Sequence, residues 1–158
     1  MRRAITAVML ASFVGTIHYK RGFRMDLTRS NNRPRVLIAD DHPGVLAMLT
    51  RVLSLECDVV GTVGDGGALL DSVAQLHPDV VLADLNMPGL SGLDVCRQLT
   101  RSNPGVKVIV LSGADDVEIA ERALAAGASA FFVKHRLRTE DLLAAVKGAA
   151  GGGVPSPD

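Results

Sequence analysis

The segment Val80-Val81-Leu82-Ala83-Asp84 is the strongest indication of the fold class. It is a run of four apolar residues followed by a carboxylate. Continuous apolar runs of this length are typical of strands in a parallel sheet that is buried on both faces. Three more apolar runs are also followed by polar residues. They are Val36-Leu37-Ile38-Ala39 before Asp40 and Asp41, Val108-Ile109-Val110-Leu111 before Ser112, and Phe131-Phe132-Val133 before Lys134. Because the carboxyl ends of parallel strands meet at one edge, we expect these five polar side chains to share one pocket.

The segments between these strands have helical spacing and short connections. From Arg35 onward, five strands each followed by a helix predict an α/β fold with a doubly wound five-stranded parallel sheet, a flavodoxin-like three-layer sandwich. The expected strand order is 2-1-3-4-5, so the first and third strands flank the switch point where ligands bind. Ser91 is the expected N-cap of the helix over residues 92–102, and Thr139 is the expected N-cap of the last helix, over residues 140–149.

Composition and charge limit the classes of function. With 47% hydrophobic and 22% charged residues, the chain of 158 residues can bury the core of one ordered domain. Residues 1–35 have a net charge of +7 and residues 36–158 a net charge of −7, so we expect no direct nucleic-acid binding by the acidic body. Cys57 and Cys96 have no metal-ligand spacing, which is typical of reduced thiols in a cytoplasmic protein.

Three parts of the chain are predicted: an N-terminal extension outside the fold (1–33), one folded domain (34–150) and a C-terminal tail or linker remnant (151–158). Arg2-Arg3 precedes a short apolar run that ends near Ile17, which is typical of a secretory signal. The cleavage site is poor, however, and Met25 is a second candidate start. We therefore favour an upstream extension and a cytoplasmic location, and the signal remains the alternative.

The predicted pocket combines three carboxylates with a hydroxyl and an ammonium group. Carboxylates this close raise one another's pKa unless a cation neutralises them, and hard oxygen ligands suit Mg²⁺. A carboxylate can also act as a nucleophile and form a reactive acyl phosphate. The residues therefore predict a Mg²⁺ cofactor and phosphoryl chemistry, with Lys134 covering one phosphoryl oxygen and Ser112 hydrogen-bonding another.

Four motifs together resemble the receiver domain of bacterial two-component response regulators. They are Ile38-Ala39-Asp40-Asp41-His42, Asp84-Leu85-Asn86-Met87-Pro88-Gly89 with Gly92, Leu111-Ser112-Gly113, and Ala126-Gly127-Ala128-Ser129 leading to Lys134. The resemblance covers about residues 35–150, and the separations between the motifs are also similar to those of the family.

The resemblance implies a role for each matching residue. It makes Asp84 the phosphoacceptor, aided by Lys134. It implies that Asp40, Asp41, Asp84 and the backbone carbonyl of Asn86 hold Mg²⁺. It makes Ser112 the switch hydroxyl and Phe131 the aromatic residue that changes rotamer with it. On this interpretation the chain is not an enzyme that acts on other molecules; it catalyses only the phosphorylation and dephosphorylation of its own aspartate.

The C-terminal part resembles the subclass in which the receiver precedes a helix-turn-helix DNA-binding domain. Three features carry this resemblance: His135 instead of proline after Lys134, the segment of residues 141–146, and the segment of residues 151–157. The implied partners are a sensor histidine kinase and either a downstream output protein or a DNA-binding domain that this chain lacks. A homodimer through the last helix stays open.

Other interpretations of the same residues remain. A phosphohydrolase of the haloacid dehalogenase type also uses a strand-end Asp and Mg²⁺, but its general acid would stand where Asn86 does. An interaction module that is never phosphorylated is a third possibility. His42, beside the acidic pair, is expected to be a partly exposed bystander, with a role in tuning metal binding as the alternative. Phe131 and Phe132 are adjacent, so one ring is expected in the core and the other at the surface.

Overall fold

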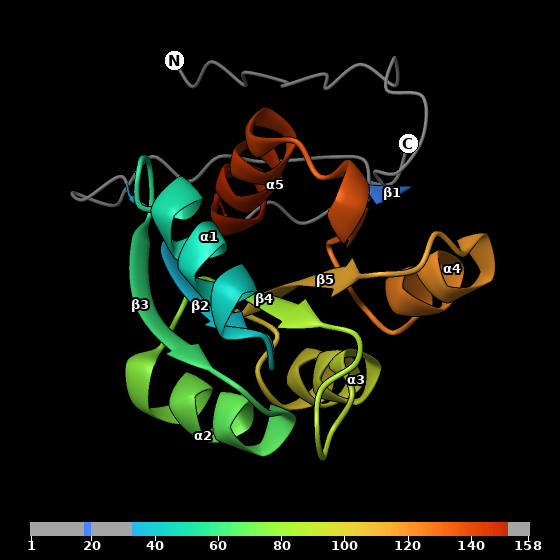
Figure 1. The fold of residues 1–158 in the computed structure, drawn as a ribbon. Coiled ribbons are helices and arrows are strands. Elements are labelled where there is room, and N and C mark those ends of the chain that lie inside the picture. Colours follow the sequence, from blue (N-terminus) through green and yellow to red (C-terminus); the bar gives the residue numbers. More distant parts are fainter. Residues whose placement is uncertain (1–17, 20–32, 152–158) are drawn as a thin grey trace, which may run out of the picture.

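The computed structural model describes residues 18–19 and 33–151 and contains one sheet flanked by helices (Figure 1). The strands are β1 His18–Tyr19, β2 Arg35–Ala39, β3 Asp58–Val63, β4 Val80–Asp84, β5 Lys107–Ser112 and β6 Ala130–Val133. The helices are α1 Pro43–Leu53, α2 Gly66–Leu76, α3 Gly92–Ser102, α4 Val117–Ala125 and α5 Thr139–Ala150, with a short 3-10 helix at Lys134–Arg136.

The sheet has the order β1-β6-β5-β4-β2-β3. Strands β2 to β6 are parallel and confirm the predicted 2-1-3-4-5 order of the five-stranded sheet. The sixth strand was not predicted: β1 pairs antiparallel with β6 and lies within the segment that we expected outside the fold. The remainder of residues 1–32 and the tail from residue 152 lie outside the described residues, so those parts of the domain prediction stay predictions.

Arg33 ties the beginning of the domain to the turn before β3. Its Nε is 3.1 Å from Asp58 Oδ1, and its NH2 donates to the carbonyls of Ser54 and Cys57 at 2.8 and 3.0 Å. The Arg33 side chain is thus bonded to the domain one residue before the predicted boundary, and the boundary itself stays a prediction.

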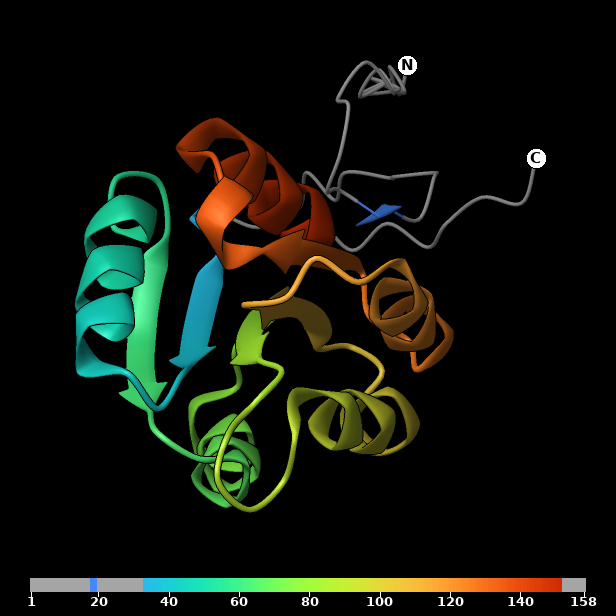
Figure 2. The ribbon, with the colours of Figure 1, turned by 45° about the vertical axis from the view of Figure 1, so that its right-hand side comes forward.

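Two apolar layers hold the helices on the sheet. Alternate residues of β2 point to opposite faces: Leu37 and Ala39 pack towards α2, α3 and α4, whereas Val36 and Ile38 pack towards α1 and α5. All four are buried, which explains why the strand reads as a continuous apolar run. The views from two sides show α1 and α5 on one face of the sheet and α2 and α3 on the other (Figures 1 and 2).

The expectation for the two adjacent phenylalanines was wrong. Phe131 and Phe132 are 1% and 2% exposed and belong to different apolar layers. Period-two alternation does send the rings to opposite faces, but helices cover both faces of β6, so neither ring reaches the surface.

The sequence predicted the N-cap residues of two helices, α3 and α5. Ser91 caps α3 as predicted: its Oγ accepts from the Asp94 backbone N–H at 3.2 Å, and the Asp94 carboxylate accepts in return from the Ser91 N–H. The prediction for Thr139 was wrong, because Arg138 occupies the N-cap position of α5 and Thr139 is already helical. Within the described residues, no helix is both long and apolar enough to cross a bilayer.

Candidate phosphoacceptor site

The ends of β2, β4, β5 and β6 bring the predicted polar residues together. Asp40, Asp84 and Ser112 are 0%, 3% and 0% exposed, and the side chain of Lys134, which comes from the end of β6, is 23% exposed. Buried carboxylates are costly unless they are paired, so the contacts of these groups determine what the site can do.

Lys134 joins the two buried carboxylates. Its Nζ lies 2.5 Å from Asp40 Oδ2 and 3.2 Å from Asp84 Oδ1. Burial alone would lower the pKa of Lys134, but the hydrogen bond to Asp40 and the charge of Asp84 outweigh it, so the pKa lies above its ordinary value. The ammonium group is therefore charged at neutral pH, and one cation serves two carboxylates.

Asp84 is left with a raised pKa in this arrangement. Burial is the largest cause, and the negative charge of Asp40 adds to it; Lys134 and a hydrogen bond from the Asn86 backbone act in the opposite direction. A second cation near Asp84 would therefore stabilise the carboxylate form, which is the form that can attack a phosphorus atom.

Oxygen donors for such a cation lie beside Asp84. Atoms of Asp40, Asp41, His42 and Asp84 that could ligate a metal all lie within 4.8 Å of one another. Carboxylate oxygens are the ligands that Mg²⁺ prefers, so the donor set fits the predicted cofactor. Asn86 is an exposed residue of the loop after β4, and a metal contact of its backbone carbonyl stays a prediction.

His42 lies closer to the acidic residues than its interpretation as a bystander suggested. Its Nδ1 is 2.9 Å from Asp41 Oδ1 and 3.2 Å from Asp40 Oδ1, although 69% of its side chain is exposed. Its backbone N–H also donates to Asp40 Oδ1 at 2.9 Å. The sequence signal was its position directly after the two aspartates, where α1 begins at Pro43.

Ser112 is held by its own loop. Its Oγ accepts from the Ala114 N–H at 3.1 Å and donates to the Ala114 carbonyl at 3.2 Å. The hydroxyl is fully buried at the end of β5, and the two bonds to Ala114 keep it within the loop that leads to α4. To contact a group on Asp84, the hydroxyl would have to exchange these bonds for new ones.

It was not predicted from the sequence that Gly92 allows α3 to lie close to the backbone of Asp84. A Cβ at this position would lie 2.6 Å from the Asp84 carbonyl oxygen, so only glycine lets the start of α3 come this close to the backbone of Asp84. A glycine directly after the Ser91 cap was the available signal, since glycine lowers helix stability and suggests a close approach instead.

The comparisons with known proteins agree with this geometry. Residues 36–147 match the family described as the response regulator receiver domain. The match covers most of the chain and spans the residues of the acidic site. The chain belongs to this family, whose members are the phosphorylation-dependent switches of two-component signalling.

Curated relatives extend the likeness. The chain is 38% identical over 115 residues to the DNA-binding response regulator MtrA of Mycolicibacterium smegmatis, covering 73% of this chain and 50% of that protein. It is 36% identical over 127 residues to the transcriptional regulatory protein DegU of Brevibacillus brevis, covering 79% and 53%. The chain thus spans about half the length of these relatives.

Solved receiver domains have the same fold. The signal receiver domain of NarL from Mycobacterium tuberculosis is similar with a TM-score of 0.72 and 34% identity, covering 76% of this chain and 98% of that one. The isolated receiver domain of RcsB from Salmonella enterica serovar Typhimurium, solved with the phosphomimetic BeF3⁻, is similar with a TM-score of 0.65 and 30% identity, covering 70% and 83%.

Proposed function

We propose that Asp84 accepts a phosphoryl group from a phosphohistidine on a sensor histidine kinase. A carboxylate oxygen of Asp84 attacks the phosphorus, the P–N bond breaks, and the departing histidine nitrogen keeps the electron pair and takes a proton. Water later cleaves the acyl phosphate and returns Asp84 and inorganic phosphate. The observation that carries the proposal is the buried Asp84 carboxylate 3.2 Å from Lys134 Nζ.

Each neighbouring residue has a part in this reaction. Lys134 neutralises one phosphoryl oxygen, at the cost of loosening its contact with Asp84. Asp40, Asp41, Asp84 and the carbonyl of Asn86 would hold Mg²⁺, which would supply positive charge to the transferred phosphoryl group. The similar receiver domain of RcsB was solved in the presence of a phosphomimetic, which supports phosphoryl chemistry in a domain of this kind.

The phosphorylated state would then change the loop before α4. We propose that Ser112 gives up its bonds to Ala114 and hydrogen-bonds a phosphoryl oxygen, and that Phe131 changes rotamer beside it. The changed surface of α4, β6 and α5 would act on an output protein or on a DNA-binding domain like those of the relatives, with homodimerisation as one mode of output. On this proposal the chain itself does not bind nucleic acid, and it works in the cytoplasm, where the kinase supplies phosphate.

A small phosphodonor with and without Mg²⁺ tests the proposal. The wild-type chain should gain the mass of one phosphoryl group only with Mg²⁺, and Asp84→Asn should gain none while its circular dichroism spectrum stays unchanged. Asp71→Asn, which changes an exposed carboxylate in the middle of α2, is the matched control and should label normally. Undiminished labelling of Asp84→Asn would remove Asp84 from this role.

A further inference from the structure

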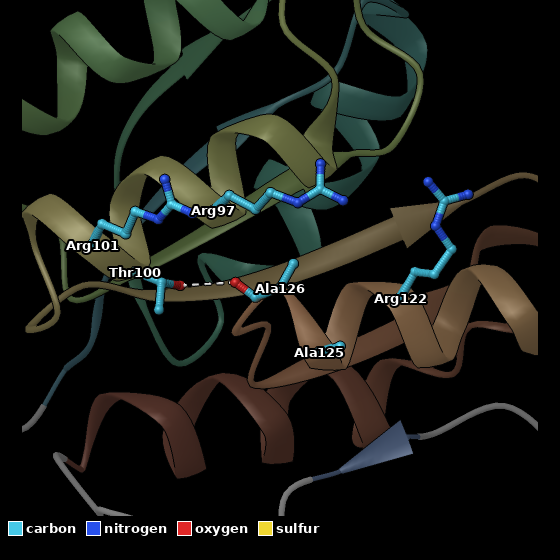
Figure 3. Close-up of a pocket in the computed structure, with 6 residues that line it drawn as sticks. All are labelled: Arg97, Thr100, Arg101, Arg122, Ala125 and Ala126. Atoms are coloured by element: carbon cyan, nitrogen blue, oxygen red, sulfur yellow. Dashed lines mark hydrogen bonds between the residues drawn. The ribbon is translucent and has the colours of Figure 1, made fainter.

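A groove between α3 and α4 gathers positive charge on an otherwise acidic domain. It has a volume of 390 Å³ and is lined by Arg97, Thr100, Arg101, Arg122, Ala125 and Ala126 (Figure 3). Half of these residues are arginines, and none of them belongs to the site around Asp84. The volume lies within the range of small-molecule sites.

The positive charges are poorly compensated by the protein. Arg97 and Arg101 are one turn apart on α3, a spacing at which like charges repel, and Arg122 lines the same groove from α4. Asp94 lies 3.4 Å from Arg97, but among residues 33–151 no acidic side chain lies within ion-pair distance of Arg101 or Arg122. With respect to the part of the chain that the structure describes, these two guanidinium groups can therefore offer their donors to a ligand.

The walls of the groove are held at a fixed spacing. Thr100 Oγ1 donates to the Ala126 carbonyl at 3.2 Å, and Cys96 Sγ lies 3.6 Å from the same oxygen. These contacts occupy the carbonyl that would otherwise repel an anion at the end of α4. Gly127 has φ +107, and a Cβ there would lie 2.2 Å from Thr100 Oγ1, so α3 and the end of α4 are in close contact.

We propose that this groove binds a small anion made of linked phosphate groups. Planar guanidinium groups bind phosphate oxygens through paired hydrogen bonds. In Figure 3 Arg97 and Arg101 project from α3 and Arg122 projects from α4, so guanidinium groups from both helices line the groove and offer more donors than one carboxylate can accept. Linked phosphates carry more acceptor oxygens than a single phosphate and can bridge guanidinium groups on both helices.

Tripolyphosphate is the probe for a calorimetric titration of the full chain in Mg²⁺-free buffer. The wild type should bind it at least about tenfold more tightly than orthophosphate, because only linked phosphates reach several arginines. Arg101→Gln and Arg122→Gln should each weaken binding by about tenfold, the typical contribution of a charge-assisted hydrogen bond. Asp84→Asn should bind like the wild type, which separates this site from phosphorylation.

Arg51→Gln is the matched control, because it removes the same charge from an exposed position in the last turn of α1, across the sheet from the groove. It should change the affinity by less than about twofold. Equal weakening by Arg51→Gln would reduce the effect to net charge and overturn the proposal. Absence of tripolyphosphate binding would overturn it too, including the case in which a DNA duplex binds to the same arginines.

Discussion

At the scale of single residues, the site depends on unequal sharing of one ammonium group. Lys134 is closer to Asp40 than to Asp84, by 2.5 against 3.2 Å. Burial also raises the pKa of Asp84, because it disfavours the charged form of the carboxyl group. The carboxylate proposed to react is thus the one that the protein stabilises less well, which suits a group that must form a new bond.

The raised pKa of Asp84 predicts how pH changes stability without metal. The folded state holds the proton more tightly than the unfolded state, whose pKa is near 3.8. The favourable contribution is complete below that pH and is lost as pH rises through the folded pKa. Asp84→Asn should therefore unfold at higher urea concentration than the wild type at pH 7, and the gap should shrink in acid. A less stable variant at pH 7 would contradict this.

Ser112 makes a separate prediction about the loop before α4. Ser112→Ala removes both bonds to Ala114 and should lower the free energy of unfolding by about 1 kcal/mol, since a buried hydroxyl with two partners is lost. Urea unfolding measures this change. Ser102→Ala removes an exposed hydroxyl that donates to the Gln98 carbonyl and should have a smaller effect.

At the scale of elements, the strands were more predictable than the helix ends and side-chain contacts. An apolar run that ends in Asp84 or Ser112 is a local signal, and parallel pairing then places those ends together. The ring of His42 against two carboxylates and the start of α5 at Thr139 depend on local geometry that no spacing shows. Burial of Phe132 depends on how α5, the next helix along the chain, folds back over β6, and the alternation of residues in the strand does not show this.

The junction of α3 and α4 gives a prediction at this scale. Gly127→Ala forces a residue with φ +107 to carry a Cβ that meets Thr100, so we expect a loss of about 1–3 kcal/mol or more. Thr100→Ala removes the nearest two atoms and should restore part of the loss, but not the part due to the backbone. A double-mutant cycle in urea measures both parts. Gly105→Ala has free space and should cost much less.

At the scale of the whole molecule, the acidic site gathers three carboxylates around one lysine, and the proposed dication would add positive charge to it. Added Mg²⁺ at a hundred times its dissociation constant should raise the free energy of unfolding by about 2.7 kcal/mol. Asp41→Asn changes an exposed carboxylate of the proposed Mg²⁺ site and should lose most of this gain while changing metal-free stability little. Asp71→Asn should keep the gain. Equal stabilisation of all three proteins would mean that Mg²⁺ binds elsewhere.

Strand β1, at one edge of the sheet, was not predicted from the sequence. Strand β1 has only two residues, too few for an alternating pattern, and it pairs through the backbone of β6. Such pairing leaves little trace in side-chain choice, because the backbone groups of every residue can form it.

The position of β1 restricts how other chains can approach. Strand β6 would otherwise be the last of its sheet, with a row of open amide and carbonyl groups that invites strand addition. With β1 paired to Ala130 and Phe131, a visiting chain could pair with these two residues only after displacing the resident strand. A partner on this flank would then depend more on the side chains of α4 and α5, the surface that we propose changes on phosphorylation.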